Sequence, residues 1–357
     1  MLCGTFTPIF CGGFLQYIKY CYEIAPHLDA KYTRKSFLLN DAVLPKRKTA
    51  ALCGCFFVRV RTRGFDGGAR ICYTGTIQIR EARDMQAKRV WAMYWSATDT
   101  TKRVVTAIAG QAAQALGVPL AEYDFTLPVA RQGAPEFTAD DLVVFGTPTY
   151  AGRVPNVLLK YLATVQGHGA AAVPVVTFGN RAFDDSLIEL RDILSDNGFV
   201  PFAAAAFVGE HSFSTTLAAG RPDADDLALA VQFGRDIAAR AAAVTAETPV
   251  IDVPGRARDE RTYYQPRDRA GNPVDIRKVK PKTNDACDDC GLCAKLCPMG
   301  SIDPADVRNY IGICIKCGAC IKKCPKGAKF YDDPGYLYHK TELEEGYKRC
   351  AAVSLFL

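Results

Sequence analysis

The sequence predicts an α/β protein built on a parallel sheet, followed by a small cysteine-rich domain. Two observations predict this organisation. Between residues 90 and 245, apolar runs of strand length alternate with segments of helical spacing. This alternation is typical of a doubly wound sheet, whose parallel strands are covered by helices on both faces. Between residues 287 and 324, eight cysteines repeat one spacing twice.

The alternation gives the expected elements of the sheet domain. Strands are predicted at residues 90–94, 141–146, 173–178 and 199–208. Helices are predicted at residues 100–116, 154–165, 185–197 and 223–245. The first of these helices stops at Gly117, and glycine is a common helix terminator.

The pattern divides the chain into five parts. They are a leader (1–84), the sheet domain (85–246), a linker rich in proline and charge (247–285), the cysteine-rich domain (286–334) and a tail (335–357). The linker is either a spacer or an extended segment that wraps the surface. We hypothesise that the natural chain starts at or near Met85, because a good first strand follows this methionine. A small extra domain in the leader is the competing interpretation.

The formal net charge of +6 is concentrated at the start of the chain. Residues 1–84 hold 13 Lys and Arg against 6 Asp and Glu, whereas the remainder holds 31 against 32. The remainder lacks the basic stripe that nucleic-acid binding needs, so we expect no nucleic-acid partner. No apolar run approaches the ~20 residues that span a bilayer. The N-terminus also lacks a secretory pattern, so we expect a cytoplasmic protein.

The eight cysteines carry the strongest chemical signal. The pattern Cys-x-x-Cys-x-x-Cys-x-x-x-Cys-Pro starts at Cys287 and again at Cys314. Three cysteines in a tight loop can reach three corners of one cubane, and the fourth, which precedes proline, ligates the other cluster. One [4Fe–4S] cluster is therefore expected on Cys287, Cys290, Cys293 and Cys324, and the second on Cys314, Cys317, Cys320 and Cys297.

Two alternatives to iron–sulfur clusters fit less well. Zinc takes four ligands, commonly as two Cys-x-x-Cys pairs, and two overlapping triplets each followed by Cys-Pro do not match that pattern. A disulfide framework is typical of small exported chains, whereas this chain is large and has no export signal. Ligation needs thiolates and therefore a reducing compartment. Of the other seven cysteines, six precede residue 73 without ligand spacing, and Cys350 stands alone.

Residues 286–334 resemble a bacterial two-cluster ferredoxin. The resemblance rests on the two cysteine motifs and on Gly291, Gly318 and Ala319, small residues that let backbone amides approach cluster sulfides. It implies a small pseudo-symmetric α+β fold and low-potential transfer of single electrons.

A second candidate site follows the first predicted strand. The loop 96–101 opens a helix and carries hydroxyls on Ser96, Thr98, Thr100 and Thr101. Free N–H groups and the positive end of the helix dipole favour an anion at such a position. The loop lacks the motifs of triphosphate and dinucleotide sites, so a single phosphate monoester fits best. An ordinary capped helix is the alternative.

Two further loops leave neighbouring strands. They contain Thr147, Pro148, Thr149, Tyr150 and Gly152 after one strand, and Gly179, Asn180 and Phe183 after the next. In a doubly wound sheet, ligands bind beyond the carboxyl ends of the strands at the point where the strand order reverses. Tyr150 and Phe183 could enclose a planar ring, and the two glycines could let backbone reach its polar edge.

These residues resemble flavodoxins fused to a C-terminal two-cluster ferredoxin, over about residues 88–357. The resemblance implies a flavodoxin-like, doubly wound, parallel five-stranded sheet that binds FMN. The phosphate would lie on Ser96–Thr101, and the ring would lie between the loops 147–153 and 178–185. The phosphate loop of the family usually has glycine where this chain has Asp99, whose carboxylate would repel phosphate unless it points outward or caps the helix.

Three functions follow from this constellation. The first is an electron-transfer protein that relays single electrons between FMN and two clusters, with redox proteins or a small molecule as donor and acceptor. The second is a flavin-dependent reductase of a small substrate, fed by its ferredoxin domain. The third is a sensor or scaffold that has lost FMN, for which Asp99 is the single supporting residue. No general base or nucleophile is evident, so no catalytic residue is assigned.

Overall fold

The computed structural model describes residues 56–58, 71–73 and 87–357. The first two segments are strands β1 (Phe56–Val58) and β2 (Ile71–Tyr73), which pair antiparallel. The rest of the predicted leader lies outside the described residues. This part includes five of the six leader cysteines, all but Cys72, and the proposed start near Met85. None of the helices in the described part of the chain combines the length and the apolar character that crossing a membrane requires.

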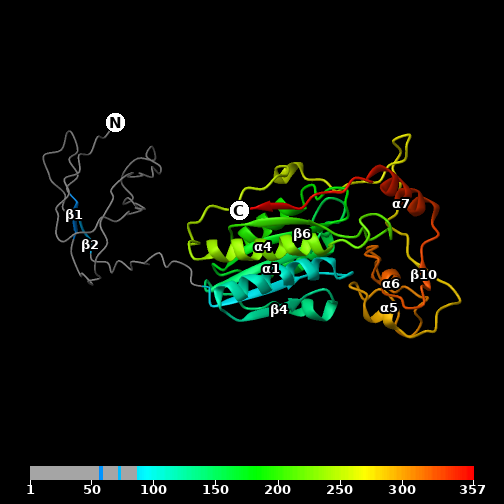
Figure 1. Cartoon of the computed structure of the whole chain (residues 1–357), viewed down its shortest axis with the longest axis horizontal. Coiled ribbons are helices and arrows are strands. Elements are labelled where there is room, and N and C mark those ends of the chain that lie inside the picture. Colours follow the sequence, from blue (N-terminus) through cyan, green and yellow to red (C-terminus); the bar gives the residue numbers. More distant parts are fainter. Residues whose placement is uncertain (1–55, 59–70, 74–86) are drawn as a thin grey trace, which may run out of the picture. The chain divides into compact units, whose positions relative to one another are not determined.

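A parallel sheet forms the centre of the domain that begins at residue 87 (Figure 1). Its strands are β3 (Arg89–Tyr94), β4 (Leu120–Asp124), β5 (Asp141–Pro148), β6 (Ala171–Phe178) and β8 (Ala204–Val208). They lie in the order β4-β3-β5-β6-β8, and every pair is parallel. This is the 2-1-3-4-5 order of flavodoxin-like folds, whose switch point lies between β3 and β5. The predicted doubly wound fold is confirmed.

Two additions extend this sheet. A two-residue strand, β7 (Val200–Pro201), pairs with the start of β6, and β8 pairs with its end. The single strand predicted at 199–208 is therefore interrupted at Phe202 and Ala203, just after Pro201, which has no N–H to donate. The last strand, β11 (Ser354–Phe356), runs antiparallel to β8 and covers the edge of the sheet.

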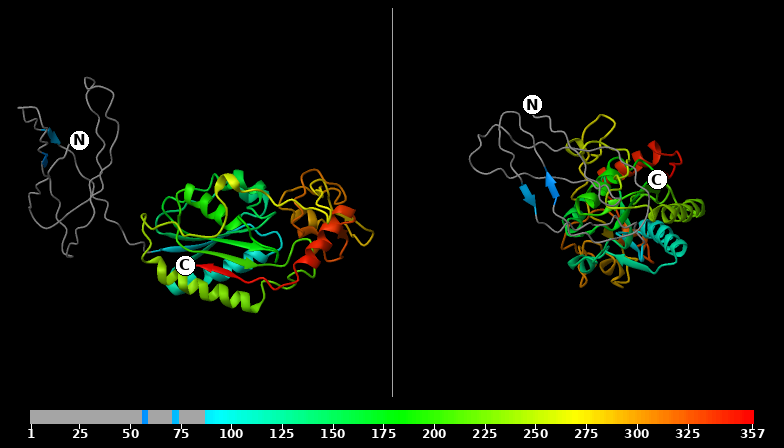
Figure 2. Two further views of the ribbon diagram at one scale, coloured as in Figure 1. Left: turned by 90° about the horizontal axis from the view of Figure 1, so that it is seen from above. Right: turned by 90° about the vertical axis from the view of Figure 1, so that its left-hand side faces the viewer.

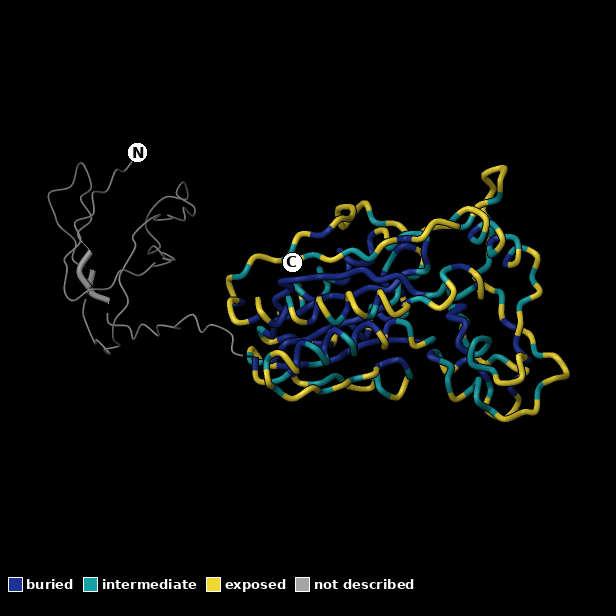
Figure 3. Tube along the Cα trace, viewed as in Figure 1, coloured by how far each residue is buried: buried dark blue, intermediate teal, exposed yellow. Residues whose placement is uncertain are grey.

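Helices cover both faces of the sheet, as Figure 2 shows from above. Helices α1 (Thr100–Leu116) and α4 (Ala224–Ala241) pack together on one face, where they bury Val104, Ile108, Phe233 and Ile237. Helices α2 (Leu159–Leu162) and α3 (Ser186–Asp196) lie over the other face. The strands between them are almost wholly buried (Figure 3), which explains their continuous apolar runs.

Local chemistry fixes the helix ends. Helix α1 ends at Gly117, whose φ of 67° suits glycine and lets its N–H bond back to the last turn. Helix α4 begins with a capping box, in which the side chains of Asp223 and Asp226 each accept from the other's backbone N–H. The helix predicted at 154–165 is shorter than expected: after a 3-10 turn (Asn156–Leu158), α2 has four residues, and i+3 turns follow it.

The segment between α4 and the cysteine motifs runs along the surface of α3. It contains a 3-10 turn (Arg258–Glu260) and strand β9 (Lys282–Thr283). Arg256 donates to the Asp185 carboxylate, and Arg261 lies 2.6 Å from Asp192. Burial by itself would raise the pKa of both carboxyls, and the arginine hydrogen bonds overcome it, so both pKa values lie below the usual range. These charged contacts tie the segment to the sheet domain.

The cysteine motifs carry two short helices, α5 (Leu292–Lys295) and α6 (Ala319–Lys322), and strand β10 (Lys329–Phe330), which pairs with β9. Helix α7 (Pro334–Gly346) follows, and the chain then returns to the sheet as β11. Asn180 anchors this return. Its amide donates to the carbonyls of Tyr347 and Arg349 at 2.7 and 2.6 Å, and its carbonyl accepts from Ala351 N–H at 3.0 Å.

We predict that Asn180→Gly detaches the tail and destabilises the protein. Glycine tolerates the φ of 65° at this position, so the variant removes the three side-chain hydrogen bonds without adding backbone strain. The free energy of unfolding in urea should fall by about 2 kcal/mol or more, because buried groups lose their partners. Ala218→Gly is the matched control, at another left-handed position without side-chain hydrogen bonds. Equal stability of the two variants would contradict the anchoring role.

Candidate functional site

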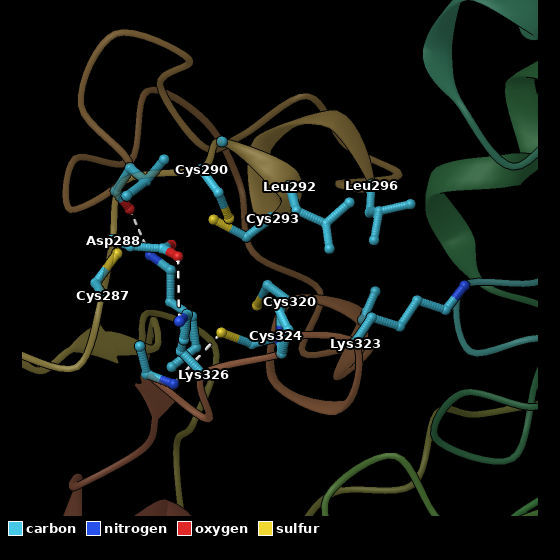
Figure 4. Close-up of a pocket in the computed structure, with 16 residues that line it drawn as sticks. Cys287, Asp288, Cys290, Leu292, Cys293, Leu296, Cys320, Lys323, Cys324 and Lys326 are labelled. Atoms are coloured by element: carbon cyan, nitrogen blue, oxygen red, sulfur yellow. Dashed lines mark hydrogen bonds and ion pairs between the residues drawn. The ribbon is translucent and has the colours of Figure 1, made fainter.

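The structure gathers the eight cysteines of the repeated motif around two cavities. The first cavity, of about 380 Å³, is lined by Cys287, Cys290, Cys293, Cys320 and Cys324. Figure 4 shows the labelled sulfurs turned toward one common space. Four of these five cysteines are the set predicted for one cluster, and they include Cys324 from the second motif. The crossover of the cysteine that precedes proline is therefore built into the fold.

The second cavity, of about 360 Å³, is lined by Cys297, Cys314, Cys317 and Cys320. These four are the set predicted for the other cluster. Cys320 and its neighbour Ala319 line both cavities, so they form part of the wall between them. Within the described residues, no three His, Cys, Asp or Glu side chains are placed to hold a single metal ion.

The two motifs have the same local geometry. Each short helix follows a glycine in the left-handed region, Gly291 with a φ of 72° and Gly318 with a φ of 78°. The cysteine before each proline accepts a backbone N–H, since Ser301 N lies 3.3 Å from Cys297 Sγ and Ala328 N lies 3.4 Å from Cys324 Sγ. Such N–H···S bonds stabilise thiolates and the added charge of a reduced cluster.

The chemistry of the sulfurs fits iron–sulfur ligation. Burial raises the pKa of the Cys317 thiol to about 12, so the thiolate needs a cation to exist in this environment. Tyr331 places its hydroxyl 3.8 Å from Cys314 Sγ. Once Cys314 is a thiolate, the hydroxyl is the only possible donor of this pair. The donor set is thus eight thiols in two fours, in cavities whose walls supply hydrogen bonds to sulfur.

The second motif packs directly on the sheet domain. Cys317 and Ala319 belong to the same buried apolar cluster as Trp95 and Phe178, which lie at the carboxyl ends of β3 and β6. A Cβ on Gly318 would lie 2.6 Å from the carbonyl oxygen of Ser212, so this approach requires glycine.

Lys322 of α6 holds the loop that follows β8. Its ammonium pairs with Glu210 and donates to the carbonyls of His211 and Ser214 at 2.7 and 2.9 Å. This lysine was not singled out from the sequence, because Lys322-Lys323 next to Cys324 reads like any exposed basic pair. Tertiary packing makes it a link between the two domains.

The predicted phosphate loop lies at the N-terminus of α1. Its first N–H groups have no partner within the helix, as at every helix start. Ser96 Oγ accepts from Lys102 N–H at 3.0 Å, which orients that hydroxyl inside the loop. Thr101 turns its side chain into the core, where its hydroxyl pairs with Thr177 at 2.7 Å. The hydroxyl of Thr101 is therefore engaged within the protein, while Thr98 and Thr100 remain partly exposed.

Asp99 adopts the left-handed conformation that glycine favours, with a φ of 65°. Its carboxylate makes no capping bond to α1 and instead lies 2.9 Å from the ammonium of Lys323. Figure 4 shows Lys323 pointing away from the first cavity, in the direction opposite to the cluster cysteines. The carboxylate that the sequence placed beside the phosphate loop is thus paired with a cation from the cysteine-rich domain.

The loop after β5 lies beside the second motif. Tyr150 and Trp95 make an edge contact with ring centroids 5.8 Å apart. Burial raises the pKa of the Tyr150 hydroxyl well above its usual value, and the neighbouring Cys317 and Cys314 add to this effect. Thr147 is fully buried, and its hydroxyl has no hydrogen-bond partner among the described residues. Gly152 has a φ of 77° and faces the Asp184 carboxylate, which a Cβ would meet at 2.4 Å.

The other predicted ring residues have structural partners as well. Thr149 pairs with Ser186 at 2.7 Å, Phe183 packs on Phe178 with centroids 5.5 Å apart, and Pro148 ends β5. Gly179 makes room for His211, whose ring a Cβ would meet at 2.4 Å. The side chain of Asn180 is used by the tail, as described above. The structure thus gathers these loops at the carboxyl ends of β3, β5 and β6.

Comparisons with known proteins agree with the cysteine chemistry. Residues 286–329 match the family model of a 4Fe-4S dicluster domain. This match and the two cysteine-lined cavities support two [4Fe–4S] clusters as cofactors and a redox role. No curated protein matches the chain.

Solved structures match the sheet domain at low identity. A flavodoxin from the domain Archaea is 14% identical, with 43% of this chain and 98% of that chain covered and a TM-score of 0.29. A Streptococcus pneumoniae TIGR4 flavodoxin is 18% identical, with 43% and 99% covered and a TM-score of 0.30. The apo form of an NADH:FMN oxidoreductase is 18% identical, with 42% and 89% covered and a TM-score of 0.31. At such TM-scores the fold assignment rests on the strand order.

We predict that His211 stays neutral at pH 7 and makes stability depend on pH. Burial lowers its pKa to about 4; Lys322, His339 and Arg181 add to this, and Glu344 opposes it. The unfolded chain therefore binds a proton that the folded chain rejects, and stability from neutral His211 is lost as pH falls from 6.5 towards 4. The unfolding free energy of wild type should fall relative to that of His211→Gln, by at most about 1.4 kcal/mol per pH unit.

Urea unfolding of both proteins between pH 4.5 and 7.5 tests this prediction. Acid loss of clusters would affect both proteins alike, so the difference between them isolates His211. A difference that stays constant across this range would contradict a neutral imidazole with a lowered pKa.

Proposed function

We propose that the chain is an electron-transfer protein that relays single electrons between FMN, held at the carboxyl ends of β3, β5 and β6, and two [4Fe–4S] clusters. One cluster is held by Cys287, Cys290, Cys293 and Cys324, and the other by Cys297, Cys314, Cys317 and Cys320. FMN exchanges one or two electrons, so it can connect a two-electron donor or acceptor to one-electron clusters.

One observation carries this proposal. The second cysteine motif shares a buried apolar cluster with the loops predicted to hold the flavin ring: Cys317 and Ala319 are part of it, and Tyr150 and Phe183 pack against it. An electron relay needs its redox centres close together, with packed protein between them. A site that only binds a small substrate over the flavin does not require the second cysteine motif to pack against the flavin loops. The second cluster would therefore be the one next to the flavin.

The residues of the three loops fit FMN. A flavin phosphate would find the N–H groups at the start of α1 and the hydroxyls of Ser96, Thr98 and Thr100. The pairing of Asp99 with Lys323 offsets the carboxylate that would otherwise repel it. The buried Thr147 hydroxyl without a partner lies on the strand that leads into the ring loop, as expected where a ligand completes the hydrogen bonding.

The protein's part in the transfer is to fix distances and to exclude water. Gly318 lets α6 approach the loop after β8, and Lys322 holds that loop through two carbonyls and Glu210. No proton needs to move with an electron that passes between clusters. This is consistent with the lowered pKa of His211, which leaves its imidazole a neutral structural group rather than a base.

Cofactor content is the first test. Protein purified without oxygen should contain about eight irons and eight acid-labile sulfides for two clusters, with one FMN, and dithionite should bleach both chromophores. Zinc in place of iron would contradict the cluster assignment. Eight irons without flavin would leave a ferredoxin on an empty scaffold. Turnover of a small substrate with a low-potential reductant would favour the reductase that the sequence also allows.

The ion pair between Asp99 and Lys323 gives a second prediction. Lys323→Met leaves the Asp99 charge without its partner and should weaken FMN binding about two- to fivefold, a small effect because the pair is partly exposed. Asp99→Asn in the same protein should restore the affinity. Fluorescence titration of flavin-free protein with FMN measures both effects, and Lys295→Met serves as the control at an exposed lysine. Equal affinities in all four proteins would place the phosphate elsewhere.

A further inference from the structure

Lys329 is a buried lysine in the middle of the cysteine-rich domain. It belongs to β10 and pairs with Thr283 of β9. Only 3% of its surface is exposed. Its ammonium donates to the Thr283 hydroxyl at 2.7 Å and to the carbonyl of Val307. A charged amine is costly to bury unless an anion compensates it, so its surroundings need an explanation.

The described residues offer Lys329 no carboxylate. Its hydrogen-bond partners are a hydroxyl and a carbonyl, both uncharged. The aromatic face of Tyr310, 5.2 Å from the ammonium, adds a weak attraction. Other lysines of this domain do have acids nearby, as Lys282 has Asp332 and Lys326 has Asp288. The missing anion must therefore come from something other than an acidic side chain.

The position of Lys329 identifies that anion. The residue lines the first cavity, together with Cys293 and Cys320. Tyr310, under its ammonium, lines the second cavity. Lys329 thus shares the first cavity with Cys320, which also lines the second cavity, and its ammonium lies over a ring that lines the second cavity.

We propose that Lys329 is the shared counter-ion of the two clusters, a positioning residue that stabilises negative charge on both of them. This inference rests on the two clusters of the proposed function. A cluster with four thiolate ligands is an anion, and reduction adds one electron to it without forming or breaking a bond. An ammonium at this position favours each reduction, and it offsets the repulsion between two electrons held on neighbouring clusters.

Lys316 provides a natural comparison. It is also buried, and its hydrogen-bond partners are also uncharged: the carbonyls of Arg277 at 2.6 Å and Cys314 at 2.9 Å. Its carbonyl partner Cys314 and its chain neighbour Cys317 both belong to the ligand set predicted for the second cluster. The position equivalent to Lys316 in the first motif is Asp289, which is exposed and pairs with Arg308. The charge of Lys316 should therefore act on one cluster, whereas that of Lys329 should act on two.

The test is an anaerobic spectroelectrochemical titration of the cluster-loaded full chain, in which an electrode supplies the electrons. Lys329→Gln keeps a hydrogen-bond donor and removes the charge. We expect both cluster midpoints to fall, each reduction becoming about tenfold less favourable, which is about 59 mV for one electron. Lys316→Gln should lower one midpoint. Lys295→Gln, at an exposed position in the first motif, should leave both midpoints in place.

Each other outcome decides the question as well. Unchanged midpoints in Lys329→Gln, or a fall in only one, would overturn the inference while leaving the proposed function intact. If Lys329→Gln loses iron, Lys329→Arg settles the cause: iron retained with Arg supports the need for charge, and iron lost with Arg identifies a purely structural residue. Wild-type protein without iron would overturn both the function and this inference, whereas wild type without flavin would affect the function alone.

Discussion

The contact between α6 and the loop after β8 is the interaction on which the rest of the arrangement depends. Gly318 lies so close to the Ser212 carbonyl that no larger residue fits, and the Lys322 ammonium binds that loop through the carbonyls of His211 and Ser214. The same helix carries Cys320, which lines both cavities. One short helix therefore positions a proposed cluster ligand and fixes its distance from the loops proposed to hold the flavin. In the proposed relay, electron transfer over this contact would require no moving part.

Charge compensation is the second organising feature. Thiolates, a flavin phosphate and reduced clusters are all anions, and the chain places cations next to each predicted position. Lys323 pairs with Asp99 at the predicted phosphate loop, and Lys316 and Lys329 lie buried beside the cysteines without an acidic partner among the described residues. A buried ammonium without a counter-ion destabilises a protein, so folding and cofactor loading are expected to support each other. Tyr331 adds a neutral donor beside Cys314.

Much of this molecule could be predicted from the sequence, because its signals are local. The apolar runs gave β3, β5 and β6 nearly to the residue, and Gly117 gave the end of α1. The spacing of eight cysteines predicted two ligand sets, and each set lies around one of the two cavities, with Cys320 lining both. The helix at 154–165 was predicted too long. Its apolar residues are buried as the helical pattern suggested, but most of them lie in turns outside the four residues of α2. The antiparallel strand β11 was missed, since three residues after a helix carry too little pattern.

The sequence by itself determined the kind of chemistry: thiols at cluster spacing, hydroxyls before a helix, and glycines at turns. These are properties of short segments, and a short segment keeps them wherever it is placed. The tertiary structure decided which groups meet. It paired Asp99 with Lys323 across 224 positions, directed the Asn180 side chain to the tail, and buried Lys329 against the first cavity. Burial and charge pairing depend on neighbours that are distant in the chain, and no local pattern distinguishes a buried lysine from an exposed one.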